Sequence, residues 1–268
     1  MLFFAYRYFT EIEDEQSADE PELELELELD EFINTDEEVV AIDPPPPPEI
    51  TRATTTPPPD MTAPEAVFIP DYDDEFFGNS LFIGDSIMTG IHLYGYIPAN
   101  NVFAKVGVNP DSVSYTEIDG QTALQKAESM RPARVYVMLG SNGISFIPAY
   151  RMVEFMEDLM AELGRAVPDS QVVLLTIPPV TFDYELENPE TTDKIKDFNR
   201  QLLESAARNN YFIVDITSVL STNEGYLSHT FAEVDGLHLK NETYKAILSH
   251  IQHTVEGSSR VRDVLNYS

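Results

Sequence analysis

From about residue 80 onward, short runs of β-branched and aromatic residues alternate with longer stretches in which apolar residues recur at helical spacing. The short runs predict five strands: Leu81–Gly84, Val102–Val106, Val135–Leu139, Val172–Thr176 and Tyr211–Val214. The longer stretches predict helices at Ile87–Tyr94, Gln121–Met130, Ala149–Arg165, Asp193–Asn209 and Glu242–His253. Strands that alternate with helices are joined by right-handed crossovers, so the pattern predicts a parallel sheet with helices on both faces.

The first part of the chain has a different composition, and we expect it to be a disordered tail or stalk covering residues 1–75, followed by one folded domain, 76–268. Residues 1–80 carry 23 acidic and two basic side chains, which gives −21 of the total net charge of −31. They also contain the proline run Pro44–Pro48. Self-repulsion and few large apolar side chains leave too little burial to offset the entropy of ordering.

Two details of this tail leave alternatives open. Glu22–Asp30 alternates Glu and Leu, which fits either a solvated segment or one ordered by a partner that the sequence does not identify. Met1–Phe9 is apolar and aromatic but far shorter than the roughly 20 residues of a membrane-spanning helix. It is either a frayed terminus or the end of a membrane anchor whose upstream part is missing.

Charge and composition exclude several classes of function. A chain with this negative charge lacks the basic surface that binds nucleic acid, and anionic lipid headgroups would repel it. There is no cysteine, and no pair of histidines in the predicted site has metal-ligand spacing beside carboxylates. Neither GxGxxG nor a Walker-type loop occurs. We therefore expect no metal and no cofactor.

Chemistry-bearing residues follow three of the predicted strands. Ser86 closes Gly-Asp-Ser after the first strand, Gly107 follows the second, and Asn142 belongs to Gly-Ser-Asn after the third. Because open α/β sheets build their sites at the carboxyl edge, these residues should converge. A serine hydroxyl needs a base to become a nucleophile, and His238 can supply one, with Asp235 three residues earlier to orient the imidazole.

Together, Gly84-Asp85-Ser86, Gly140-Ser141-Asn142 and Asp235-Gly236-Leu237-His238 resemble the motifs of the SGNH (GDSL-type) hydrolase family. The resemblance covers roughly residues 80–256 and implies a three-layer α/β/α fold with a five-stranded, flavodoxin-like parallel sheet. It also implies roles for the residues above. Ser86 would be the nucleophile, completed by Asp235 and His238, and the oxyanion hole would consist of the Ser86 and Gly107 backbone amides and the Asn142 side chain.

Each of these residues also has an interpretation without catalysis. Ser86 is a favoured residue for capping the helix that follows it. Asn142-Gly143 and Asp235-Gly236 are common turn dipeptides, and Gly107 could simply permit a tight turn. In one position the sequence departs from the family, since Gly143 stands where the block Gly-x-Asn-Asp has its aspartate. A supporting hydrogen bond is then either missing or supplied elsewhere.

We therefore expect a serine esterase that hydrolyses or transfers acyl groups, with a small-molecule or glycan ester as substrate. O-acetyl esters of a carbohydrate or cell-wall glycan come first, because a stalk-like N-terminus suits an extracytoplasmic, cell-surface enzyme, and loop aromatic rings can stack on sugars. A lipid-directed acylhydrolase or lysophospholipase is one alternative. A catalytically silent interaction module is the other.

Overall fold

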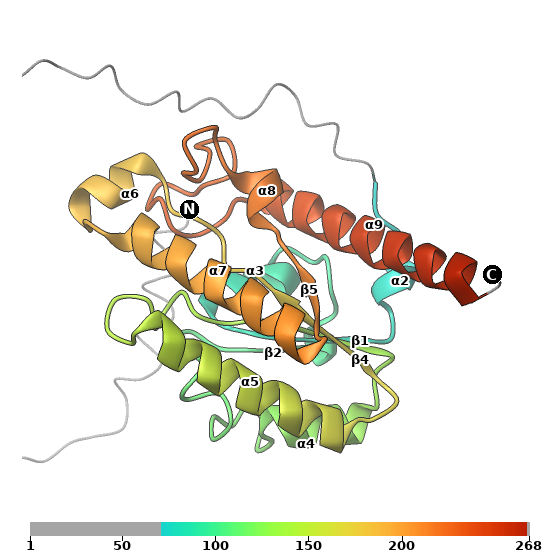
Figure 1. Cartoon of the computed structure of the whole chain (residues 1–268). Coiled ribbons are helices and arrows are strands. Elements are labelled where there is room, and N and C mark those ends of the chain that lie inside the picture. Colours follow the sequence, from blue (N-terminus) through green and yellow to red (C-terminus); the bar gives the residue numbers. More distant parts are fainter. Residues whose placement is uncertain (1–70, 267–268) are drawn as a thin grey trace, which may run out of the picture. The chain divides into compact units, whose positions relative to one another are not determined.

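A sheet of strands forms the centre of the fold (Figure 1). It has five parallel strands in the order β2-β1-β3-β4-β5. The computed structural model describes residues 71–266. The predictions for the tail, including Glu22–Asp30 and Met1–Phe9, concern residues 1–70 and lie outside the described residues. The strands are β1 (Ser80–Gly84), β2 (Val102–Ala104), β3 (Arg134–Met138), β4 (Gln171–Leu175) and β5 (Phe212–Val214).

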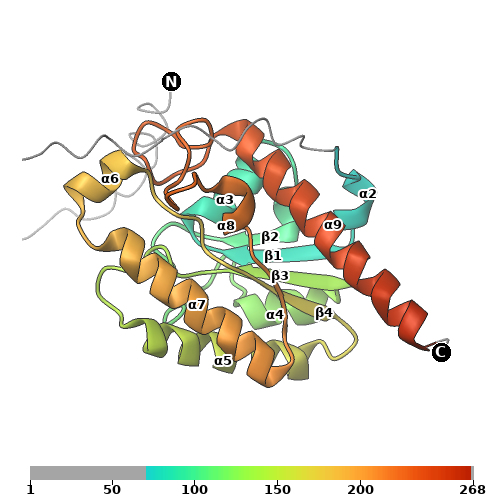
Figure 2. The ribbon, with the colours of Figure 1, turned by 45° about the horizontal axis from the view of Figure 1, so that its top comes forward.

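Helices cover both faces of this sheet, so the predicted three-layer architecture is confirmed. The longer helices are α3 (Ser86–Leu93), α4 (Ala123–Met130), α5 (Ala149–Ala166), α7 (Thr191–Asn209) and α9 (Asn241–Asn266). The short ones are α2 (Asp74–Phe77), η1 (Ala99–Asn101), α6 (Phe182–Glu187) and α8 (Thr217–Leu220). Figure 2 shows α3, α8 and α9 on one side of the sheet and α4, α5 and α7 on the other.

The predicted elements agree with the observed ones except at some ends. The second strand stops at Ala104 instead of continuing to Val106, because residues 105–107 turn outward into solvent. The last helix does not end at His253 but continues to Asn266, since the segment in between contains no proline and a single glycine. The helices α6 and α8 were not predicted, because six and four residues are too few to show a helical period.

The core lies on both sides of the central strands. All five residues of β1 are buried, as expected of a strand covered on both faces. Phe82 on β1 lies beside Tyr136 on β3, with ring centroids 4.7 Å apart. The apolar side of α5 is buried as its spacing predicted, through Met152, Val153, Met156, Leu159, Met160 and Leu163.

The first described residues already pack on this domain. Phe77 of α2 is buried, the Asp73 backbone N–H donates to Gln252 Oε1 at 2.8 Å, and Asp71 forms an ion pair with Lys245. No helix within residues 71–266 combines the length and the apolar character needed to cross a bilayer.

The topology determines where a site can form. The chain leaves β1 for β2 on one side and then returns to place β3 on the other side of β1. Loops that leave β1 and β3 therefore diverge at their carboxyl ends, and such a switch point opens a crevice in parallel sheets. Ser86 and Asn142 follow these two strands.

Candidate active site

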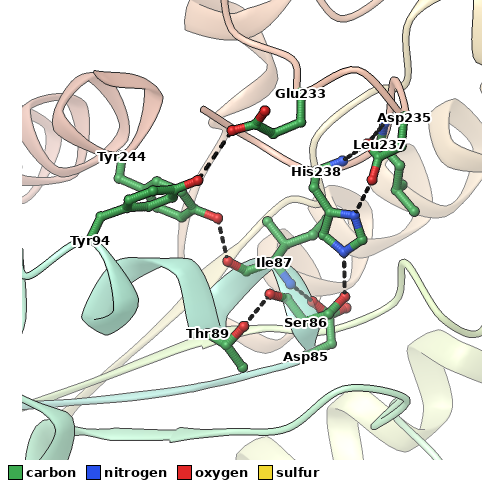
Figure 3. Close-up of polar contacts among 10 residues, drawn as sticks. All are labelled: Asp85, Ser86, Ile87, Thr89, Tyr94, Glu233, Asp235, Leu237, His238 and Tyr244. Atoms are coloured by element: carbon green, nitrogen blue, oxygen red, sulfur yellow. Dashed lines mark hydrogen bonds and ion pairs between the residues drawn. The ribbon is translucent and has the colours of Figure 1, made fainter. Parts of the chain in front are cut away.

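Ser86 stands at the junction of β1 and α3 (Figure 3). The residue that caps α3 is Asp85, whose Oδ1 accepts the Ile87 backbone N–H at 3.0 Å. Ser86 is instead the first residue inside the helix, so the interpretation of Ser86 as a helix cap is wrong. Its hydroxyl is left available, at the positive end of the α3 dipole.

His238 joins Ser86 to Asp235. The Nε2 atom of His238 lies 3.2 Å from Ser86 Oγ, and its Nδ1 lies 2.7 Å from Asp235 Oδ2 (Figure 3). A neutral imidazole protonated at Nδ1 donates to the carboxylate and keeps Nε2 free to accept the serine proton. The sequence expected these three side chains to converge, and the structure brings them together across 152 residues of chain.

A tight turn holds the carboxylate in place. Asp235 Oδ1 accepts the backbone N–H groups of Leu237 at 3.0 Å and His238 at 2.9 Å. From the other side, the Thr181 backbone N–H donates to Gly236 O at 2.9 Å. The second carboxylate oxygen is thereby aimed at the imidazole, and the loop is fixed to the segment that starts α6.

The electrostatics of this pair favour an ionised aspartate beside a basic histidine. Burial works against the charge of Asp235, but hydrogen bonds from the His238 ring and from the backbone outweigh it and lower the pKa of Asp235 to about 2. The hydrogen bond to Asp235 raises the pKa of His238 against the opposing effect of burial. His238 is thus a stronger base than an isolated imidazole.

Asp85 is a buried carboxyl group directly before Ser86. Burial raises its pKa to about 6, although hydrogen bonds from Ile87 and Ser141 and the charge of His238 counteract the rise. Its Oδ2 atom is buried without a partner of normal hydrogen-bond geometry among the described residues. The charged form of this carboxyl group is therefore costly in the folded protein.

The side chain of Asn142 is oriented by the loop that contains Gly107. Asn142 Nδ2 donates one hydrogen to Val108 O at 3.1 Å, and the second hydrogen of that amide remains available. Gly107 itself is exposed, with φ at +82°, a conformation that favours glycine. The structure thus places Asn142 beside the segment that contains Gly107. It also shows Gly107 in the turn conformation that the alternative interpretation expected.

Gly143 lies close to α5, where a side chain would force its neighbours to shift. A Cβ atom there would lie 2.8 Å from Met152 Sδ and 3.3 Å from Ile147 Cδ1. The backbone N–H of Gly143 instead closes a turn to Gly140 O at 2.9 Å. The missing acidic side chain is therefore replaced by packing against α5, and the orientation of Asn142 comes from Val108.

The sequence between residues 82 and 246 matches the GDSL-like Lipase/Acylhydrolase family, and the chain therefore belongs to this family of ester hydrolases. The resemblance stated from the motifs is confirmed. Comparison with curated protein sequences found no match.

Solved structures share the fold at low sequence identity. A provisionally assigned platelet activating factor from Streptococcus pneumonia matches with a TM-score of 0.53 and 22% identity, over 65% of this chain and 82% of the other. A provisionally assigned acylhydrolase from Bacteroides fragilis gives 0.52 and 20%, over 71% and 92%. A GDSL-like lipase from Bacteroides thetaiotaomicron gives 0.51 and 18%, over 69% and 90%.

Sequence reasoning missed the residues around this group. Glu233, five residues before His238, accepts a hydrogen bond from Tyr94 at 3.1 Å, and Tyr244 contacts the backbone of α3. The sequence placed Tyr94 only at the end of the predicted helix Ile87–Tyr94. These contacts span more than 130 residues, so no local pattern could have revealed them.

Within residues 71–266, no group of three or more His, Cys, Asp or Glu side chains is arranged to hold a metal ion.

Proposed function

We propose that the protein is a serine ester hydrolase in which Ser86 is the nucleophile, His238 the general base and Asp235 the orienting carboxylate. The observation that carries this proposal is the position of the His238 ring, with Nε2 at 3.2 Å from Ser86 Oγ and Nδ1 at 2.7 Å from Asp235 Oδ2. A base placed between a nucleophile and a carboxylate is the arrangement that activates serine in acyl transfer.

In the first step, Nε2 of His238 takes the hydroxyl proton while Ser86 Oγ bonds to the ester carbonyl carbon. The carbonyl oxygen becomes an anion, which the backbone amides of Ser86 and Gly107 and the free hydrogen of Asn142 Nδ2 stabilise. Asp235 stabilises the imidazolium that has formed.

The tetrahedral intermediate then breaks the bond to the alcohol oxygen, and His238 returns its proton to the leaving alcohol. An acyl group remains on Ser86. Water attacks this acyl-enzyme while His238 takes one of its protons, and the collapse of the second intermediate releases the acid and restores the Ser86 hydroxyl.

As substrate we propose O-acetyl esters of a carbohydrate or cell-wall glycan, at an extracytoplasmic surface. Two features support this choice. The site is open, since the side chains of His238 and Asp235 are 38% and 50% exposed, so a bulky alcohol part can approach Ser86. Exposed aromatic residues follow β2 and β3 at the same edge of the sheet: Tyr115, Phe146 and Tyr150. Such rings can stack on sugar faces.

A lipid-directed acylhydrolase is the second candidate. Exposed aliphatic side chains also lie on segments at the carboxyl edge, namely Val106 after β2, Leu186 on α6 and Val234 beside Asp235. Exposed apolar side chains around a site favour an apolar or amphipathic substrate.

The proposal is tested by labelling and by turnover. A fluorophosphonate probe should label the wild-type protein and a Ser129→Ala control, which changes an exposed helix serine, but not Ser86→Ala. Ser86→Ala and His238→Ala should each lose hydrolysis of an activated acetyl ester by up to about 10⁶ in turnover while remaining folded. Wild-type turnover in folded Ser86→Ala would refute the mechanism.

The substrate class is tested separately. Activity toward acetylated oligosaccharides that exceeds activity toward long-chain acyl esters supports the glycan proposal, and the reverse preference supports the lipid alternative.

A further inference from the structure

Two tyrosines pack behind the nucleophile. Tyr94 directly follows α3, and its ring lies against Tyr244 of α9 with centroids 5.6 Å apart. The Tyr244 hydroxyl donates to Ile87 O at 2.7 Å, one residue after Ser86. A Cβ atom at Gly90 would lie 2.0 Å from that hydroxyl oxygen, so only glycine lets α9 approach α3 this closely. The helix that carries Ser86 is thus fixed from behind.

From this position Tyr94 reaches the loop that carries His238. Its hydroxyl donates to Glu233 Oε1 at 3.1 Å, and Figure 3 shows this contact beside the catalytic group. Glu233 is part of the same turn as His238, because its backbone N–H donates to His238 O at 2.8 Å. The Gly236 N–H in turn donates to Glu233 O at 3.0 Å. A movement of Glu233 would therefore move the backbone of His238.

The charges around this contact fit a permanent hydrogen bond. Burial raises the pKa of Tyr94, and the neighbouring Glu233 raises it further, so the phenol remains a donor at neutral pH. Glu233 is also one of three carboxylates whose negative charge raises the pKa of His238, after Asp235 and Asp85.

We propose that Tyr94 and Glu233 are positioning residues. Their hydrogen bond, here called the Tyr94–Glu233 bridge, fixes the position of the His238 loop relative to the helix that carries Ser86. This inference rests on the proposed function. The base and the nucleophile come from segments 152 residues apart, and their 3.2 Å contact depends on how the two segments are held. A misplacement of about 1 Å can cost about 10² in rate, so a contact that joins the two segments acts on turnover.

The experiment compares four single variants and one double variant with the wild-type protein in steady-state hydrolysis of an acetyl ester. Tyr94→Phe removes only the hydroxyl and keeps the ring on Tyr244. Glu233→Gln keeps an acceptor oxygen but removes the charge, and Glu233→Ala removes both. Tyr96→Phe is the matched control, because this ring also lies near Tyr244, with centroids 6.4 Å apart.

We expect Tyr94→Phe to lower kcat about tenfold, less than the roughly 10² expected of a full misplacement of about 1 Å, with KM nearly unchanged. The lost hydrogen bond should also lower Tm by a few degrees. Tyr96→Phe should keep the wild-type kcat. Glu233→Gln should keep kcat within about threefold, while the acidic limb of its kcat/KM profile moves to lower pH, because a negative charge near His238 is lost. The double variant Tyr94→Phe/Glu233→Ala should be no slower than Glu233→Ala alone.

Equal kcat values for Tyr94→Phe and Tyr96→Phe, or losses that multiply in the double variant, would overturn the bridge. Such a result leaves the proposed function intact as long as labelling and turnover still depend on Ser86. Labelling or turnover that persists in Ser86→Ala overturns the proposed function instead.

Discussion

The buried carboxyl group of Asp85 makes Asp85→Asn a substitution with a calculable effect on stability. Burial raises the pKa of Asp85 from the model-compound value of 3.8 to about 6. Because the folded protein holds this proton more tightly than the unfolded chain, the contribution of Asp85 to stability is greatest below pH 3.8 and is lost as the pH rises through 6. At 1.36 kcal/mol per pKa unit, the difference between the pKa values of the unfolded and folded states corresponds to about 3 kcal/mol of stability.

Asparagine removes this loss while keeping the helix cap. Its side-chain oxygen can still accept the Ile87 N–H, and Asn and Asp are comparable N-cap residues. At pH 5 the wild-type protein has lost about half of the 3 kcal/mol, and the rest is lost by pH 8. The free energy of unfolding of Asp85→Asn minus that of the wild type should therefore grow by about 1 to 2 kcal/mol between pH 5 and pH 8.

Urea denaturation of both proteins at pH 5, 6, 7 and 8 measures this difference directly. Lower pH is avoided, because protonation of the 47 acidic residues brings the net charge toward zero and promotes association. The matched control is Asp73→Asn, at the exposed cap of α2, where the carboxylate also accepts a backbone N–H. A difference for Asp85→Asn that stays constant with pH, or shrinks as the pH rises, would refute the reasoning.

Four further outcomes are expected. Asn142→Ala should lower kcat by about 10² to 10³ with the fold intact, since one oxyanion donor is lost, and wild-type kcat would exclude that role. The kcat/KM of the wild type should rise with pH and reach half its maximum above the ordinary histidine pKa of about 6.5, because the raised pKa of His238 must be passed before the ring can accept a proton. Asp235→Asn should lower turnover by about 10⁴ and shift that midpoint to lower pH, which a pH–rate profile checks. Deletion of residues 1–70 should leave Tm and small-ester turnover nearly unchanged, because their composition offers little to bury, and a loss of several degrees in a melting curve would contradict this.

Features that depend on neighbouring residues could be predicted from the sequence. The strands and the buried face of α5 were predictable because apolar periodicity is a local signal that the core then reinforces. Ser86, Asn142 and His238 could be proposed as site residues because each belongs to a motif of three or four adjacent residues that follows a strand or forms a turn.

Contacts between distant segments left no such local signal. Asp85, and not Ser86, caps α3. Which of the two side chains accepts the backbone N–H of Ile87 depends on how the folded chain enters the helix. Gly143 could be seen as a departure from the family, but its reason, the sulfur of Met152 packed against it, required the placement of α5. The pairing of Tyr94 with Glu233 depends in the same way on the folded loops.

The openness of the His238–Asp235 pair has a consequence for substrate choice. With 38% and 50% of these side chains exposed, water shares the space in which charge develops and weakens every interaction there. A substrate with a large alcohol part would cover the pair and expel that water, so the substrate itself would act as the cover that the free enzyme lacks. Within a series of acetyl esters of equal leaving-group acidity, the larger alcohols should then react faster at saturation, and the enzyme would select its substrate by how well it closes the site.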